Sequence, residues 1–161
     1  MTLLLAGLTG LVILLDQITK FVAFKQEAPV AIIPGIIELV HAKNEGIAFG
    51  IGSGIKYGPV ILGILSIITV LFLLFFYYLY TPRRKIDTVS IALISGGALG
   101  NLIDRFMNSG KVLDFIQLKF VNWPAFNFAD ISIVAGVIIL VISIAFDNAE
   151  KSNKKTKNQD V

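Results

Sequence analysis

The sequence predicts an all-α membrane protein with four transmembrane helices, and three observations support this fold class. The chain has 161 residues, of which 55% are hydrophobic and 16% are charged, and its mean hydropathy is +0.80. A soluble domain usually carries about a quarter charged residues. The apolar residues also fall in blocks of about the 20 residues that a helix needs to cross the hydrocarbon core. Finally, two basic clusters flank these blocks, as topology signals do.

Four blocks are predicted to span the membrane, at residues 2–24, 59–80, 88–106 and 128–146. The first block lacks a basic start and a small-residue cleavage site, so we interpret it as a retained helix and not as a signal peptide. Gly58-Pro59 is a helix-start signal for the second block, and Asp87 is the predicted N-cap of the third. We expect the four spans to form one domain over residues 1–150.

The distribution of Lys and Arg predicts the orientation of the spans. Residues 83–85 are all basic, and four lysines lie in residues 151–157, whereas the other two loops hold only scattered lysines. The positive-inside rule therefore places both termini in the cytoplasm. The chain beyond Asp147, including a basic cytoplasmic tail at 151–161, is expected to be solvated and disordered.

The two outer segments, residues 25–58 and 107–127, are predicted to be more than linkers. The run 36–41 has strand-like apolar content, which predicts a small extended element at the membrane surface. The second segment mixes polar residues with Phe120 and Trp123. Because aromatic side chains of this kind favour the membrane interface, we expect this segment to lie along it.

Polar groups in three spans are predicted to share one level near the outer face of the membrane. The distance from the cytoplasmic end of the span is 14, 14, 17 and 17 residues for Asp16, Asn101, Asp104 and Asp130. At the helical rise per residue, these offsets correspond to about 21 to 26 Å of a core about 30 Å thick. Ionisable groups at membrane depth are costly, so their convergence indicates a functional site.

Helical spacing adds two expectations. Asp16 and Lys20 are four residues apart and can pair on one helix face, either neutralising each other at the membrane edge or taking a direct role in the site. Gly96 and Gly100 have the spacing that lets another membrane helix approach closely, so we interpret them as packing residues.

Asp114 and Asp130 are the predicted catalytic pair. Asp114 follows the third span and Asp130 opens the fourth, where Asn127 shares its face and is also a candidate N-cap. Capping explains one aspartate at a helix start, but two adjacent carboxylates share a proton and take opposite roles. One activates water, while the other hydrogen-bonds to the scissile carbonyl or protonates the leaving amine. The pattern indicates an intramembrane aspartyl protease.

Other chemistries find few suitable residues. The absence of cysteine excludes disulfides and thiolate nucleophiles. His41 is the single histidine, so neither a metal site nor a Ser-His-Asp triad is expected. The net charge of +3 lies mainly in the flanking clusters and does not indicate nucleic-acid binding. Two alternatives are a cation transporter, whose site would lie near the midplane between repeats, and an assembly protein, which would leave Asp114 and Asp130 unexplained.

Five short motifs follow one another along nearly the whole chain. They are Asp16-Gln17-Ile18-Thr19-Lys20, Asn44-Glu45-Gly46-Ile47-Ala48-Phe49, Gly97-Ala98-Leu99-Gly100-Asn101-Leu102-Ile103-Asp104-Arg105, Asp114-Phe115 and Phe126-Asn127-Phe128-Ala129-Asp130. In this order and on these spans, the chain resembles the lipoprotein signal peptidases (signal peptidase II), bacterial aspartyl proteases with four membrane helices.

The resemblance implies roles for individual residues. Asp114 and Asp130 would be the catalytic dyad. The side chains that bind substrate or orient the dyad would be those of Asn44, Gly46, Asn101, Arg105 and Asn127. Asp16 and Lys20 would support activity and fold, and Asp104 would be a structural partner. No cofactor and no metal would be needed.

The resemblance also implies a substrate and a location. The peptide bond before a diacylglyceryl-modified lipobox cysteine of a bacterial prolipoprotein would be hydrolysed. The partners would be these prolipoproteins and membrane lipid, with no nucleic acid, and we expect a monomer. The chain would cross the bacterial cytoplasmic (plasma) membrane several times, with its active site near the extracytoplasmic face and a small extracytoplasmic β-cradle around residues 36–49.

Overall fold

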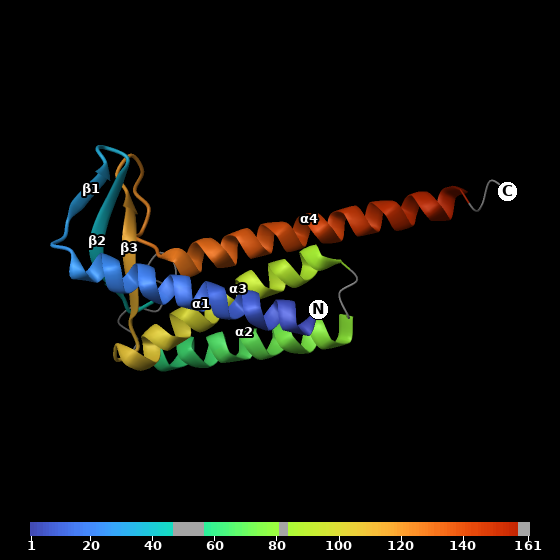
Figure 1. Ribbon diagram of the computed structural model, residues 1–161, viewed down its shortest axis with the longest axis horizontal. Helices are drawn as coiled ribbons and strands as arrows, with labels where there is room; N and C mark the ends of the chain where they lie inside the picture. The colour runs from blue at the N-terminus through green and yellow to red at the C-terminus, as the bar shows by residue number, and fades with distance from the viewer. Residues whose placement is uncertain (47–56, 81–83, 158–161) are drawn as a thin grey trace.

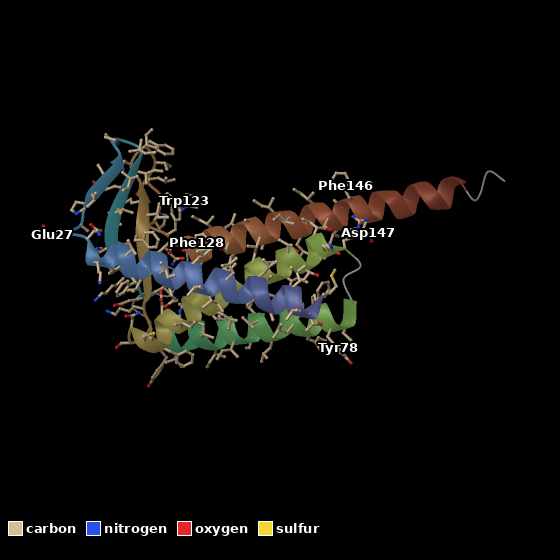
Figure 2. The ribbon with its side chains drawn as sticks, viewed as in Figure 1. Glu27, Tyr78, Trp123, Phe128, Phe146 and Asp147 are labelled. Carbon is tan, nitrogen blue, oxygen red and sulfur yellow. The ribbon has the colours of Figure 1, made fainter. Side chains whose placement is uncertain are left out.

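The computed structural model describes residues 1–46, 57–80 and 84–157. In this part of the chain the elements are the helices α1 (Thr2–Lys25), α2 (Gly58–Tyr80), α3 (Lys85–Met107) and α4 (Phe128–Lys157), and the strands β1 (Val30–Ile33), β2 (Ile37–Asn44) and β3 (Val112–Leu118). The helices lie side by side with the sheet at one end of the bundle (Figure 1). Figure 2 shows Glu27 and Trp123 at this sheet end, and Tyr78 and Asp147 at the opposite end.

The four predicted spans are confirmed. Helical stretches long and apolar enough to cross a membrane occupy Thr2–Lys25, Val60–Leu79, Lys85–Met107 and Phe128–Asp147. The outer faces of the bundle carry large exposed apolar side chains, such as Leu3 (89% exposed), Phe72 (63%) and Val141 (60%). A soluble monomer rarely exposes apolar surface on this scale, whereas lipid tails cover it at no cost. The chain is a multi-pass membrane protein.

Helix α3 lies at the centre of the bundle. In its apolar stretch 72% of the residues are buried, compared with 17–22% in the other three spans. Close approach depends on its glycines: a methyl group at Gly96 would lie 2.6 Å from Cβ of Val12 on α1, and one at Gly97 would overlap the carbonyl of Ala129 on α4. Gly100 also faces α1. The predicted packing role of Gly96 and Gly100 is therefore confirmed.

The sheet is antiparallel, in the order β1-β2-β3, and its strands run across the end of the bundle (Figure 1). Strand β2 confirms the extended element predicted around residues 36–41. For residues 112–118 the sequence predicted an interfacial segment, and the structure shows a strand, because β2 supplies the partner for its backbone groups. Residues 47–49 of the second motif lie outside the described residues.

Two predictions about helix ends are wrong. Helix α3 begins at Lys85 with Arg84 as its N-cap, so Asp87 lies in the first turn, where its carboxylate accepts a hydrogen bond from the Ser143 hydroxyl of α4. Helix α4 continues to Lys157, so residues 148–157 are helical and not disordered. Ala, Glu and Lys favour helix, an existing helix needs no new nucleus, and lysines are favourable near a helix C-terminus.

Candidate active site

The polar groups of α1 and α3 meet inside the bundle near its sheet end, as the sequence predicted. The ammonium nitrogen of Lys20 lies 2.8 Å from Asp16 Oδ2 and 2.7 Å from Asp104 Oδ2. It also donates a hydrogen bond to Asn101 Oδ1 at 3.1 Å. The two carboxylates and the lysine are at most 2% exposed. Charges buried this deeply are stable only when they are paired, and here each one is.

Strand β3 places Asp114 against the bundle. The register pairs Asp114 with Ala42, and Asn44 lies two residues further along β2, on the same face of the sheet. As a result, Asn44 Nδ2 donates to Asp114 Oδ2 at 3.0 Å. The other oxygen, Oδ1, accepts from Asn127 Nδ2 at 2.7 Å. Asp114 is 2% exposed and has both oxygens held by amide donors.

The start of α4 places Asp130 beside Asp114. An isolated bridge between Ile116 and Phe126 ties the chain just before α4 to strand β3. Asn127 Oδ1 then accepts the backbone N–H of Asp130 at 3.0 Å, and Asp130 Oδ2 accepts the N–H of Asn127 at 3.1 Å. This reciprocal pair is a capping box. Asn127 is therefore both the N-cap of α4 and a direct partner of Asp114.

Two asparagines connect the two aspartates. Asn101 Nδ2 donates to Asp130 Oδ1 at 2.9 Å, and Asn101 Oδ1 accepts from both Lys20 Nζ and Asn127 Nδ2. Because both donors approach the amide oxygen of Asn101, its NH₂ group is directed at Asp130. Asn127 in turn contacts both carboxylates of the pair.

Burial, and after it the charge of Asp130, raises the pKa of Asp114 from 3.8 to about 6. The hydrogen bonds from Asn44 and Asn127 oppose this shift because they favour the ionised form. Asp130 therefore lies close enough for its charge to act on Asp114. A pair that carries one proton can act as acid and base at the same time.

Arg105 joins the α3 helix to the loop after β2. Its Nη1 donates to the carbonyl of Asn101 at 3.3 Å, and its Nη2 donates to the carbonyl of Gly46 at 3.4 Å. Its buried Nε has no hydrogen-bond partner among the described residues. The carboxylates of Asp130, Asp104 and Asp114 lie near enough to interact with its charge.

Sequence reasoning did not identify Gln17. Its amide donates to Asp16 Oδ2 and to Asp104 Oδ1, both at 3.1 Å, and to the carbonyl of Gly100 at 3.3 Å. A polar amide at membrane depth was a usable signal, because polar groups are costly there.

The single histidine is held by contacts with α1. The His41 ring stacks on Phe24, with centroids 4.5 Å apart, and its Nε2 lies 3.0 Å from the carbonyl oxygen of Ala23. Over residues 1–46, 57–80 and 84–157, no three His, Cys, Asp or Glu side chains are arranged to hold a metal ion.

Comparisons with known proteins place this geometry in a family. Residues 8–146 match the family model described as signal peptidase (SPase) II. The chain belongs to the signal peptidase II family. The matched range includes most of α1, the sheet, α3 and the start of α4, and so it covers all the polar side chains described above. The chain is therefore a membrane-embedded peptidase.

Curated relatives and solved structures agree with the family assignment. The lipoprotein signal peptidase of Syntrophotalea carbinolica is 36% identical over 83% of this chain and 85% of its own length. That of Halothermothrix orenii is 38% identical over 82% of this chain and 88% of its own length. A solved bacterial membrane enzyme superposes with a TM-score of 0.82, at 32% identity, over 91% of this chain and 90% of the other.

Proposed function

We propose that this signal peptidase II hydrolyses the peptide bond before the diacylglyceryl-modified cysteine of bacterial prolipoproteins, with Asp114 and Asp130 as the catalytic dyad. The names of the relatives support the substrate class. The observation that carries the proposal is the bridged pair of carboxylates. They come from β3 and α4, are joined through Asn127 and Asn101, and lie at one end of four apolar helices.

The environments of the two aspartates suggest different roles. Asp114 is almost fully buried and its pKa is raised to about 6, so it holds the shared proton. Asp130 is half-buried, which leaves it accessible to a water molecule. Its two oxygens accept hydrogen bonds from Asn101 and from the backbone of Asn127, and these bonds fix the orientation of the carboxyl group. Asp130 is thus the base and Asp114 the acid.

The reaction then proceeds through two balanced proton transfers. Asp130 takes a proton from water as the water oxygen bonds to the scissile carbonyl carbon, and Asp114 gives its proton to the carbonyl oxygen. The resulting diol collapses when the carbon–nitrogen bond breaks. Asp130 passes its proton to the leaving nitrogen, and a diol hydroxyl returns a proton to Asp114. The products are a carboxylic acid and the free amine of the cysteine, and the dyad regains its starting state.

The remaining polar groups are proposed to hold the substrate backbone beside the dyad. Asn44 donates a hydrogen bond to Asp114, and Arg105 donates one to the carbonyl of Gly46, two residues after Asn44. The buried Nε of Arg105 is a donor available for a substrate carbonyl. The dyad lies near the sheet end of the bundle. The lipid anchor of the substrate would therefore hold the scissile bond at the same depth in the membrane as the dyad. The basic residues at the opposite end support an extracytoplasmic site in the bacterial cytoplasmic membrane. We propose that the chain acts as a monomer.

A cleavage assay with a diacylglyceryl-modified prolipoprotein tests this proposal. Purified wild-type protein is compared with Asp114→Asn and Asp130→Asn, which keep the side-chain shape and remove the ionisable group. The proposal expects wild type to cut directly before the modified cysteine and each folded variant to be inactive. Cleavage by both variants would show that other groups activate the water. Mass spectrometry of the products identifies the bond that is cut.

A further inference from the structure

Two buried carboxylates outside the dyad accept the backbone N–H groups directly before its two members. Asp104 Oδ2 accepts the N–H of Leu113 at 3.0 Å, and Leu113 precedes the first catalytic aspartate. Asp16 Oδ1 accepts the N–H of Ala129 at 3.0 Å, and Ala129 precedes the second. The two contacts are alike in chemistry and in distance, although Asp104 lies on α3 and Asp16 lies on α1.

Lys20 joins these two carboxylates. Its ammonium group lies 2.8 Å from Asp16 and 2.7 Å from Asp104, and it is 2% exposed. We propose that Asp16, Lys20 and Asp104 form an aspartate clamp that sets the spacing between the two catalytic aspartates. In this clamp Asp16 and Asp104 are positioning residues, and neither needs to touch the substrate. The proposal rests on the proposed function of the dyad.

The clamp supplies a constraint on the dyad that the secondary structure does not. One catalytic aspartate lies on a strand and the other at a helix start, so secondary structure alone does not fix their separation. The Ala129 N–H is among the first N–H groups of α4 and has no partner inside its own helix. A carboxylate from another helix satisfies it and thereby ties α4 to α1. Charge-assisted bonds of this kind are stronger than neutral ones, and they act here in a water-poor interior.

The loss of an ion cluster with a merely structural role would have a different effect from the loss of the clamp. Buried ion clusters can often be replaced without loss of fold, and their loss then changes stability and not the catalytic step. The loss of a clamp that positions the reacting groups must lower kcat, because a misplacement of about 1 Å can cost about 100-fold in rate. The binding groups around Arg105 are not part of the clamp, so KM should change little.

The first test displaces Asp16 without removing a charge. A methyl group at Gly100 would lie 2.5 Å from Asp16 Oδ2, so Gly100→Ala pushes this carboxylate out of place. Gly96→Ala is the matched control, because its methyl group would lie 2.6 Å from Cβ of Val12 on the same helix. Both variants strain the α1–α3 contact, and only one reaches the clamp. We expect kcat to fall about 100-fold in Gly100→Ala and at most a few-fold in Gly96→Ala.

The second test uses the isosteric variants Asp16→Asn and Asp104→Asn, alone and together. Asparagine keeps an oxygen for the backbone N–H and loses the charge that holds Lys20. Members of one clamp should act as a unit, so the kcat of the double variant should lie within a few-fold of the lower single variant. Asp87→Asn, at the opposite end of α3, controls for the removal of a buried carboxylate.

The outcomes separate the clamp from the dyad. Losses of kcat that multiply in the double variant, or an unchanged kcat in folded Gly100→Ala, would overturn the clamp. If Gly100→Ala does not fold, the asparagine variants decide the question. Asp114→Asn is measured in the same assay: if it still cleaves, the proposed dyad is wrong. If it is inactive while the clamp variants keep wild-type kcat, only the clamp is wrong.

Discussion

Replacing Asn44 by alanine should shift the pH dependence of cleavage in a defined direction. Asn44 donates one of the two amide hydrogen bonds that stabilise the ionised form of Asp114, at 3.0 Å. Its loss makes the ionised form less favourable, so the pKa of Asp114 should rise above about 6. The proposed mechanism requires a protonated Asp114 as the acid, with Asp130 as the base. The alkaline limb of the profile should therefore move to higher pH in Asn44→Ala.

The size of this shift follows from the strength of the bond. A hydrogen bond to a charged group contributes about 1.5–3 kcal/mol, and one pKa unit corresponds to about 1.4 kcal/mol. Asn44 is half-buried, so water will replace part of the lost bond. We expect a shift of about one unit. The profile of kcat/KM is the one to measure, because it reports groups in the free enzyme.

Lys43→Ala is the matched control for this experiment. Lys43 is the exposed neighbour of Asn44 on β2, it pairs with Leu113, and among the described residues it forms no hydrogen bond or ion pair with Asp114. Its replacement should leave the alkaline limb in place. A limb that stays fixed, or moves to lower pH, in Asn44→Ala would refute the assignment of Asp114 as the proton-carrying member of the dyad.

Two further variants test residues away from the dyad. Ser143→Ala removes the hydrogen bond to the buried carboxylate of Asp87. The free energy of unfolding, measured by thermal unfolding in detergent, should therefore fall by about 1.5–3 kcal/mol. The kcat should stay at the wild-type value. A changed kcat would mean that this end of the bundle is coupled to the site. His41→Phe keeps the stacking on Phe24, and cleavage should persist. Inactivity in a folded His41→Phe protein would instead place the imidazole in the reaction.

The sequence predicted the four spans and the shared level of their polar groups because both follow from local rules. A span is a block of apolar residues of a certain length, and depth in a helix follows from counting residues. The pairing of Asp16 with Lys20 rests on the same rules and on the cost of charge at membrane depth. These expectations needed no knowledge of tertiary structure.

The rest of the site depends on contacts that no local pattern records. Strand β3 is short, and its partner β2 lies about 70 residues earlier, so Val112–Leu118 looked like an interfacial segment. The bonds from the N–H groups of Leu113 and Ala129 to carboxylates involve the backbone, which carries no sequence signal. The sequence did not predict the helical extension of α4 for another reason. The charged composition of this segment is common to helices and to disordered tails.

We propose that the aspartate pair activates a water molecule and forms no covalent bond to the substrate. A single turnover in H₂¹⁸O tests this directly, with the label located by mass spectrometry. Water activation predicts one ¹⁸O atom in the new carboxyl group of the released signal peptide and none in the side chains of Asp114 and Asp130. If ¹⁸O appears in either aspartate while the peptide carries none, an acyl-enzyme intermediate forms and the proposed mechanism is wrong.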